Sequence, residues 1–369
     1  MEARPTLQDV AKLAGVGKAT ASLALRNHPR ISEATRARVR AAAEQLQYRP
    51  DPALARIAAH RWRTREHPSD VVVAFVTMNH PWTHVEPLSP LRLGAREEAE
   101  RLGYRLEHFR LDDFPGPEQL ARVLSHRGIR GVITGPILRE DFAARFPWGS
   151  FISIGASRGY FEPPINLVVP DFHHALVHAW NRAAQAGYRR IGVALLKELK
   201  AVDLFDKVSA ALFCQSRLQP EQAALPVAHF PLEDQAEFRA WLREHRPEVV
   251  LGFNDTVYWW MRQAGLRVPE DVAFISLDLD PVPDPGRPCL SGLNPDYAHI
   301  GRIAAGQLDI LLRTNQLGLP ARPLTVHVPS VWIDGSTLPV RPGGSPDPGP
   351  RAERAEVAWR GKAPVAGGR

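Results

Sequence analysis

The sequence has only two cysteines, Cys214 and Cys289, among its 369 residues. This scarcity excludes the disulfide framework that stabilises small secreted domains. No apolar run approaches the roughly 20 residues that a bilayer-spanning helix needs. The opening Met-Glu-Ala-Arg-Pro also lacks the basic-then-apolar order of a signal peptide. We therefore expect a cytoplasmic protein without a membrane partner.

Excess positive charge is missing from most of the chain and concentrated at one end. Residues 1–65 carry 13 Lys and Arg against five Asp and Glu, whereas residues 66–369 carry 33 against 35. This asymmetry is expected when a module that binds a polyanion is joined to a nearly neutral domain. Taken by itself, the uneven distribution of charge is explained equally well by a solvated basic surface.

The helical pattern of the first fifty residues favours the polyanion-binding interpretation. Leu7, Val10, Ala11 and Ala14 recur at the spacing of one helix face, and Gly15-Val16-Gly17 ends that helix. A second helix over 18–25 after so short a turn predicts a helix-turn-helix. Its outward face is expected to carry Lys18, Ala19, Ser22, Leu23 and Arg26.

A third helix completes the small domain. Ser32 can cap it, and its inner stripe is expected to consist of Thr35, Val39, Ala42, Ala43 and Leu46. Asp51-Pro52 then begins a very short helix, marginal by itself, that we expect to form only against a partner. We assign residues 1–50 to an all-α helix-turn-helix headpiece and residues 51–69 to this short helix and a linker.

Residues 6–16, 20–22, 31–36 and 48–50 closely resemble the headpiece of the lactose-repressor family of bacterial transcription regulators. The resemblance implies that residues 53–59 form a hinge helix when two subunits pair on an operator, with Ile57 as a wedge in the minor groove. The expected DNA contacts are Thr6, Leu7, Lys18, Ala19, Thr20, Ser22, Leu23, Arg26, Asn27, Arg30, Ser32, Tyr48 and Ile57.

The headpiece departs from the family pattern at the residues that read DNA. Gly17 stands where the family usually has a serine, and Lys18 and Ala19 occupy the two positions that most often select base pairs. Lys18 can donate to guanine, whereas Ala19 and Leu23 can touch thymine methyl groups. We therefore expect base recognition with few hydrogen bonds.

From residue 70 onward, short apolar runs alternate with helical stretches, which predicts parallel strands covered by helices on both faces. The runs are 71–76, 104–110, 131–134, 151–154, 191–196, 249–253 and 272–277. We expect an α/β ligand-binding domain over 70–338, built from two doubly wound parallel-sheet subdomains. Residues 187–191, 254–255 and 265–272 are similar to the periplasmic sugar-binding fold, which implies an effector-binding and dimerisation domain. Residues 339–369, rich in Gly, Pro, Arg and Ala, are expected to be disordered.

Polar and aromatic side chains follow several of these strands, where α/β sheets bind ligands. Asn79, His80 and Trp82 follow the first strand, Asn254 follows 249–253, and Asp278 follows 272–277. Asn254 and Asp278 also coincide with effector-binding positions of the family. Carboxylate, amide and aromatic groups together suit a sugar. The alternative is that Asp278 caps a turn and Trp82 packs within a loop. The Arg-x-x-Gly that relatives carry is absent from 201–208, which leaves the effector class open.

A competing interpretation is a serine hydrolase, because Gly155-Ala156-Ser157-Arg158-Gly159 fits G-x-S-x-G. It is disfavoured because residues 160–164, with two prolines, cannot continue as the helix that a nucleophile elbow requires. We expect no catalytic residues, no metal and no cofactor. The expected function is a homodimeric repressor on a near-palindromic operator, controlled by a small sugar effector.

Overall fold

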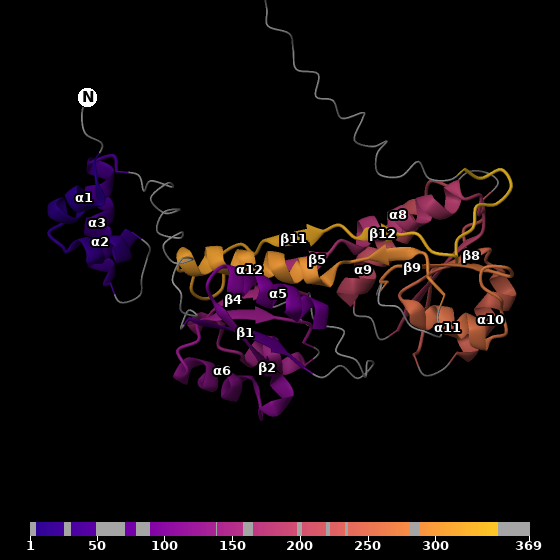
Figure 1. Cartoon of the computed structure of the whole chain (residues 1–369), viewed down its shortest axis with the longest axis horizontal. Helices are drawn as coiled ribbons and strands as arrows, with labels where there is room; N and C mark the ends of the chain where they lie inside the picture. Colours follow the sequence, from indigo (N-terminus) through magenta and orange to yellow (C-terminus); the bar gives the residue numbers. More distant parts are fainter. Residues whose placement is uncertain are drawn as a thin grey trace, which may run out of the picture. The chain divides into compact units, whose positions relative to one another are not determined.

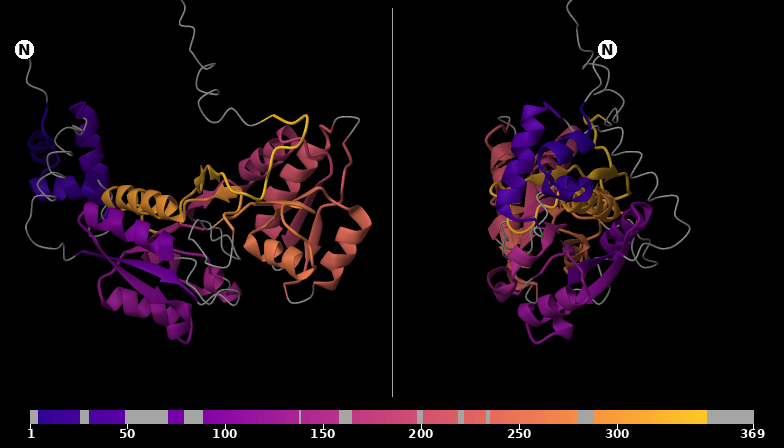
Figure 2. Two further views of the ribbon diagram at one scale, coloured as in Figure 1. Left: turned by 45° about the vertical axis from the view of Figure 1, so that its right-hand side comes forward. Right: turned by 90° about the vertical axis from the view of Figure 1, so that its left-hand side faces the viewer.

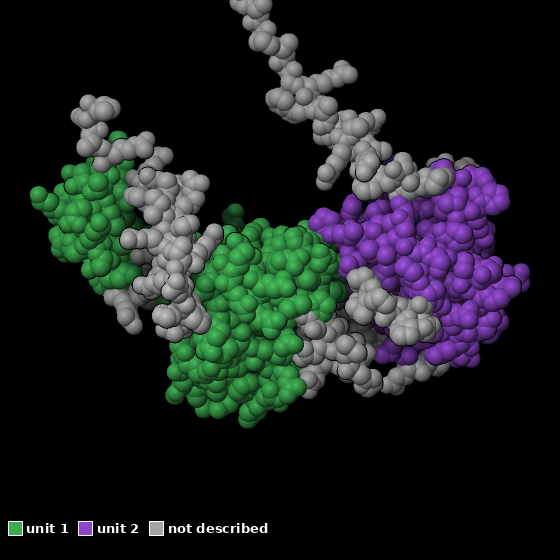
Figure 3. Space-filling view, viewed as in Figure 1, with its two compact units in different colours: residues 1–171, 295–328 green, residues 172–294, 329–369 purple. Residues whose placement is uncertain are grey.

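The computed structural model describes residues 5–25, 31–48, 71–78, 89–137, 139–157, 165–197, 201–218, 222–232, 235–279 and 288–345. The chain divides into two compact units (Figure 3). Unit 1 comprises residues 1–171 and 295–328, and unit 2 comprises residues 172–294 and 329–369. The chain therefore passes between the units three times, and each unit is assembled from separate stretches of sequence.

The headpiece consists of three short helices with a core of their own (Figure 1, indigo). They are α1 (Leu7–Leu13), α2 (Lys18–Leu25) and α3 (Glu33–Gln45). Gly15, at the end of α1, has a φ of +64°, a conformation that residues with a Cβ rarely adopt. The three helices pack around small side chains, namely Val10, Ala11, Ala14, Ala21, Ala24, Val39, Ala42 and Ala43. The predicted helix-turn-helix is confirmed.

Unit 1 also contains a six-stranded sheet in which every pairing is parallel. The strand order is β11-β5-β4-β3-β1-β2. The strands are β1 (Val72–Thr77), β2 (Arg105–Arg110), β3 (Gly131–Thr134), β4 (Ile152–Gly155), β5 (Asn166–Pro170) and β11 (Thr325–Val328). Helices α5 (Ser89–Arg101) and α12 (Tyr297–Arg313) cover one face (Figure 2). The other face packs against α6 (Pro117–His126) and α7 (Glu140–Arg145).

Helices α5 and α12 approach each other so closely that glycine is required at the contact. A Cβ built on Gly94 would lie 1.9 Å from the carbonyl oxygen of Ala298, and one on Gly301 would lie 2.0 Å from that of Leu91. The two backbones therefore touch directly, without side chains between them. This contact holds the late segment α12 to the early segment α5 in one core.

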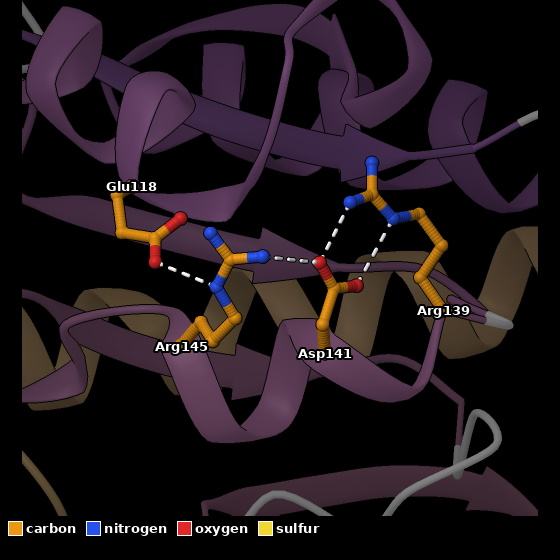
Figure 4. A network of polar contacts seen from close by, with 4 residues as sticks. All are labelled: Glu118, Arg139, Asp141 and Arg145. Carbon is orange, nitrogen blue, oxygen red and sulfur yellow. Dashed lines mark hydrogen bonds and ion pairs between the residues drawn. The ribbon is translucent and has the colours of Figure 1, made fainter.

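An arginine–carboxylate network connects α6 and α7 at the surface of unit 1 (Figure 4). Arg145 donates to Glu118 at 2.7 Å and to Asp141 at 3.2 Å, while Arg139 makes two bonds to Asp141, at 3.0 and 2.7 Å. Hydrogen bonding from Arg139 holds the pKa of Asp141 below its usual value. Because these side chains are partly solvated, the network orients α7 more than it stabilises the fold.

Unit 2 has a second six-stranded sheet, with the order β12-β10-β9-β8-β6-β7. Among the strands that the structure describes in this sheet, only the edge pair β10–β12 is antiparallel. The strands are β6 (Ile191–Leu196), β7 (Ala228–Phe230), β8 (Val249–Gly252), β9 (Ala273–Ser276), β10 (Gly292–Asn294) and β12 (Val331–Ile333). Helices α8 (Phe172–Gln185) and α9 (Ala201–Gln215) cover one face, and α10 (Ala236–His245) and α11 (Asp255–Gln263) cover the other. The predicted class, a helical headpiece with two parallel-sheet α/β subdomains, is confirmed.

The segment after β12, described as far as residue 345, packs against the rest of unit 2. Arg341 is ion-paired with Glu248, lies 4.5 Å from the centre of the Tyr188 ring, and donates its backbone N–H to Ala186. Residues 339–345, which sequence analysis placed in the disordered tail, are thus held by specific contacts. Residues 346–369 lie outside the described residues.

No helix in the described part of the chain is long and apolar enough to cross a membrane.

Candidate DNA interface and effector site

The exposure of α2 matches a recognition helix that buries one face and presents the other. Ala21 and Ala24 are fully buried against α1 and α3, whereas Lys18 and Ala19 are exposed. Thr20, Ser22 and Leu23 are intermediate in exposure, as are Leu7 and Tyr48, which pack at the edge of the headpiece core. Lys18 and Ala19 lie in the first turn of α2, where helix-turn-helix proteins contact base edges.

Two other predicted DNA contacts have a structural role in the headpiece. Thr6 forms a capping box with Asp9: its hydroxyl accepts from the Asp9 N–H at 3.4 Å, and its own N–H donates to the Asp9 carboxylate at 2.8 Å. Ser32 caps α3 by accepting from the Thr35 N–H at 3.3 Å. Both side chains are exposed at helix starts. Whether they also touch DNA stays a prediction.

The same cap lowers the pKa of the Asp9 carboxyl group. The hydrogen bond from the Thr6 hydroxyl, at 2.7 Å, holds the pKa of Asp9 below its ordinary value. On α3, Glu33 is paired with Arg36 at 2.8 Å. Lys12 and Lys18 are exposed on α1 and α2. Lys12 and Lys18 thus leave positive charge on the headpiece surface, whereas the carboxylates of Asp9 and Glu33 interact with residues close to them in sequence.

Several predicted contacts lie outside the described residues, so their placement stays a prediction. In the headpiece and hinge these are Arg26, Asn27, Arg30 and Ile57. In the effector site they are Asn79, His80 and Trp82.

The other two predicted effector residues lie at neighbouring strand ends of unit 2. Strands β8 and β9 are parallel, with Gly252 paired with Ser276, so Asn254 and Asp278 each follow the same edge of the sheet by two residues. Both are half-buried. Asn254 also caps α11, since its side-chain oxygen accepts from the Thr256 N–H at 3.1 Å. Its amide NH₂ is the part suited to meet a ligand.

Sequence analysis did not single out Lys207, a buried cation near this edge. The side chain of Lys207 is 1% exposed, and its ammonium lies over the ring of Phe253, the residue before Asn254. A signal was available: Lys207 shares one face of α9 with Leu204, Ala211 and Cys214, at spacings of three, four and three residues. A lysine within an apolar helical stripe is unusual enough to be noted.

Ser157, the nucleophile of the competing hydrolase interpretation, lies just after β4. Residues 156 and 157 form a bend rather than the start of a helix. Residues 158–164 lie outside the described part, and the next described element is β5. A nucleophile elbow needs a helix directly after the serine. That the segment directly after Ser157 does not form such a helix stays a prediction of the sequence.

A helix-turn-helix headpiece, followed by a ligand-binding domain of two parallel-sheet units, defines a class of DNA-binding transcription regulators. Residues 6–51 match the model of the bacterial regulatory proteins of the lacI family, and residues 181–337 match the periplasmic binding protein-like domain. The chain therefore contains a lacI-type helix-turn-helix domain and a periplasmic binding protein-like domain, and it is similar to regulators of the lacI family.

Two curated relatives are transcription regulators rather than enzymes. The HTH-type transcriptional regulator CelR of Thermobifida fusca is 25% identical over 323 residues, which cover 82% of this chain and 90% of CelR. The NTD biosynthesis operon regulator NtdR of Bacillus subtilis is 23% identical over 296 residues, which cover 74% of this chain and 82% of NtdR.

Solved structures of such regulators share the fold. A CelR–cellobiose complex aligns with a TM-score of 0.55 at 21% identity, covering 90% of this chain and all of that one. The lac repressor dimer bound to operator and an anti-inducer aligns at 0.52 and 18% identity, covering 91% of this chain and all of the other. At these identities the likeness establishes the fold alone.

Proposed function

We propose that this chain is a repressor that binds a near-palindromic operator as a homodimer and that a sugar effector changes its affinity for DNA. The observation that carries the proposal is α2, with Ala21 and Ala24 buried and Lys18 and Ala19 exposed in one headpiece. A helix so oriented can enter a major groove without unpacking its own core. Action on DNA implies the cytoplasm as the working compartment.

The homodimer and the near-palindromic operator are proposed together. A single headpiece reads only a few base pairs, so two headpieces related by a twofold axis double the site and require inverted half-sites. The relative solved on its operator is described as a dimer. Ile57 would complete the contact as a wedge in the minor groove.

A sugar is the proposed effector. Asn254 and Asp278 place an amide and a carboxylate at adjacent strand ends of unit 2, which is chemistry that matches vicinal hydroxyl groups. One relative of the same fold was solved with cellobiose. The effector shifts DNA binding only by the difference between its affinities for the DNA-competent state and for the other state.

Selection of bound duplexes from random DNA, with and without a panel of sugars, tests the proposal. We expect an inverted repeat to be enriched and one sugar to weaken its binding. If no duplex is enriched and binding does not depend on salt, the DNA-binding proposal is wrong.

Two lysine variants test the role of α2 within that experiment. Lys18→Ala should relax base preference at one position in each half-site, by about 1–3 kcal/mol of discrimination. Lys12→Ala is the matched control, because Lys12 is equally a surface lysine but lies on α1. It should lower affinity for all duplexes alike. An unchanged selected motif for Lys18→Ala would assign Lys18 to a phosphate contact.

A further inference from the structure

A cavity of about 480 Å³ lies at the edge of the unit 2 sheet that is opposite to the candidate effector residues. Glu248, which lines it, directly precedes β8, and Val272, which also lines it, directly precedes β9. Because these two strands are parallel, both residues are at the amino edge of the sheet. Asn254 and Asp278 follow the same strands, at the carboxyl edge. The cavity is therefore a different site from the one proposed for the sugar.

Four arginines line this cavity, and three of them come from the end of α10. Arg239 and Arg243 are about one turn apart on that helix, and Arg246 directly follows it. Arg341 reaches the cavity from the segment after β12. The apolar part of the lining consists of Leu242, Pro247, Ala264, Leu266 and Val272.

The two acids in the lining already have cationic partners. Glu248 accepts from two backbone N–H groups, at 2.7 and 3.0 Å, and is ion-paired with Arg341. Asp271 accepts from the Nε and the Nη2 atoms of Arg267, at 3.1 and 2.7 Å. These two carboxylates therefore do not neutralise the three arginines at the end of α10.

Those three arginines are exposed, and no carboxylate among the described residues pairs with Arg239, Arg243 or Arg246. The dipole of α10 favours a cation in the last turn, which accounts for Arg243 but not for Arg239, nearer the start of the helix. Like charges four residues apart on a helix repel each other and destabilise it. An anion bound between the two guanidinium groups would remove that repulsion.

The chemistry of the cavity favours a ligand with two phosphate groups. The planar guanidinium group matches phosphate oxygens with two parallel hydrogen bonds. One phosphate group carries about 1.5 to 2 negative charges at neutral pH, so two such groups balance three guanidinium groups. The volume lies within the range of small-molecule sites, about 300–1,000 Å³, and the arginines line a hollow with apolar walls. A small ligand therefore fits this place better than a DNA duplex does.

We propose that this cavity is a second ligand site of the protein and that it binds a diphosphate group, either as free pyrophosphate or as part of a nucleotide. The site goes beyond the proposed function, since it requires neither an operator nor a sugar effector.

Calorimetric titration of the full chain with pyrophosphate, ADP and AMP tests the proposal, at about 0.15 M salt and without divalent cations. We expect pyrophosphate or ADP to bind at least about tenfold tighter than AMP. Tighter binding of ADP than of pyrophosphate identifies a nucleotide as the source of the diphosphate, and equal or weaker binding of ADP identifies the free diphosphate. If AMP binds as tightly as both diphosphates, or if neither diphosphate binds, the inference is overturned.

Matched double variants locate the binding, which is necessary because the headpiece is also basic. Arg239→Gln combined with Arg243→Gln should weaken diphosphate binding at least about tenfold. Arg189→Gln combined with Arg217→Gln is the control, because these exposed arginines line a neighbouring cavity and removing them changes the net charge equally. The control should bind as the wild type does. Unchanged affinity of the first double variant overturns the inference.

Two further measurements separate binding from other roles of the arginines. Without ligand, the Arg239→Gln/Arg243→Gln variant should melt at the wild-type temperature or above, because it relieves repulsion; a clear fall makes the arginines structural and overturns the inference. With the diphosphate, amide exchange should slow over residues 242–248 and 264–272. Protection confined to the headpiece overturns it as well.

DNA binding by the same variant distinguishes the remaining alternative. If the Arg239→Gln/Arg243→Gln variant loses affinity for duplex DNA and no diphosphate binds, the arginines contact DNA and the inference is overturned. We expect the variant to select the same operator as the wild type. Failure of either proposal therefore leaves the other standing.

Discussion

The contact between α5 and α12 offers the sharpest test of the structure, through Gly301→Ala. A Cβ on Gly301 would lie 2.0 Å from the carbonyl oxygen of Leu91 and 2.8 Å from the amide nitrogen of Ala95. Because nonbonded atoms prefer about 3.5 Å or more, the two helices must separate by over about 1 Å. Backbone atoms oppose the methyl group, so no side-chain rotation relieves the clash.

The expected cost follows from two opposing effects. Overpacking a well-filled contact costs about 1–3 kcal/mol or more, whereas alanine in place of glycine within a helix gains about 1 kcal/mol. With a clash between backbones the first effect dominates, and we expect a net loss of about 2 kcal/mol or more. The loss should be concentrated in α5, α12 and the strands beneath them.

Gly306→Ala is the matched control, because it lies on the same helix in an open position. The nearest atom to its Cβ would be a Glu98 carboxylate oxygen at 3.9 Å. This variant keeps the helix-propensity gain without a clash and should be stabilised by up to about 1 kcal/mol. Urea unfolding gives the sign of each change, and hydrogen exchange locates it. If Gly301→Ala is as stable as Gly306→Ala, the close packing described above is refuted.

Three further predictions concern the headpiece and unit 2. Ala21→Asp places a charge in the fully buried headpiece core and should abolish operator binding while leaving the melt of the larger domain unchanged; a gel shift at wild-type affinity would contradict this. Hydrogen bonding from Arg267 lowers the pKa of Asp271 to about 2. The stability that this ionised carboxylate contributes is therefore present above the unfolded-state pKa near 3.8 and is lost as the pH falls toward 2. In NMR titration, Arg267→Ala should return the pKa of Asp271 toward 3.8. Burial, and then the charge of Lys197, lower the pKa of His229. Stability should therefore fall as pH drops below 6.5, the ordinary value. His229→Gln should flatten that dependence in urea midpoints measured between about pH 7.5 and about pH 5, and an unchanged slope would assign it to other groups.

Local patterns predicted the headpiece and most of the central strands because there the deciding interactions are close in sequence. Apolar spacing, the Ser32 cap and the turn at Gly15 lie within a few residues of the helices they define, and α2 begins and ends at the predicted residues. Strands β3 and β6 also match their predicted ranges, since each is buried on both faces and reads as a continuous apolar run.

Strands β5, β7, β10, β11 and β12, and the assignment of segments to the two units, were not predicted. Strands β7, β10, β11 and β12 are only three or four residues long and, apart from β10, mostly half-exposed, so no long apolar run marks them. Strand β11 joins β5 in unit 1, although about 150 residues separate the two strands. Strand β12 follows β11 after only two residues, yet it joins β10 in unit 2. The sequence pattern of a strand indicates which of its faces is buried, but it does not indicate which distant strand pairs with it.

The sequence by itself determined the class of protein: a basic helix-turn-helix headpiece ahead of a nearly neutral parallel-sheet α/β domain, because charge distribution and hydrophobic periodicity are local properties. Only the tertiary structure decided which segments share a unit, and that Lys207 lies buried between Phe172 and Phe253 near Asn254. These residues come from three separate stretches of the chain, and only the crossovers of the folded sheet bring them together.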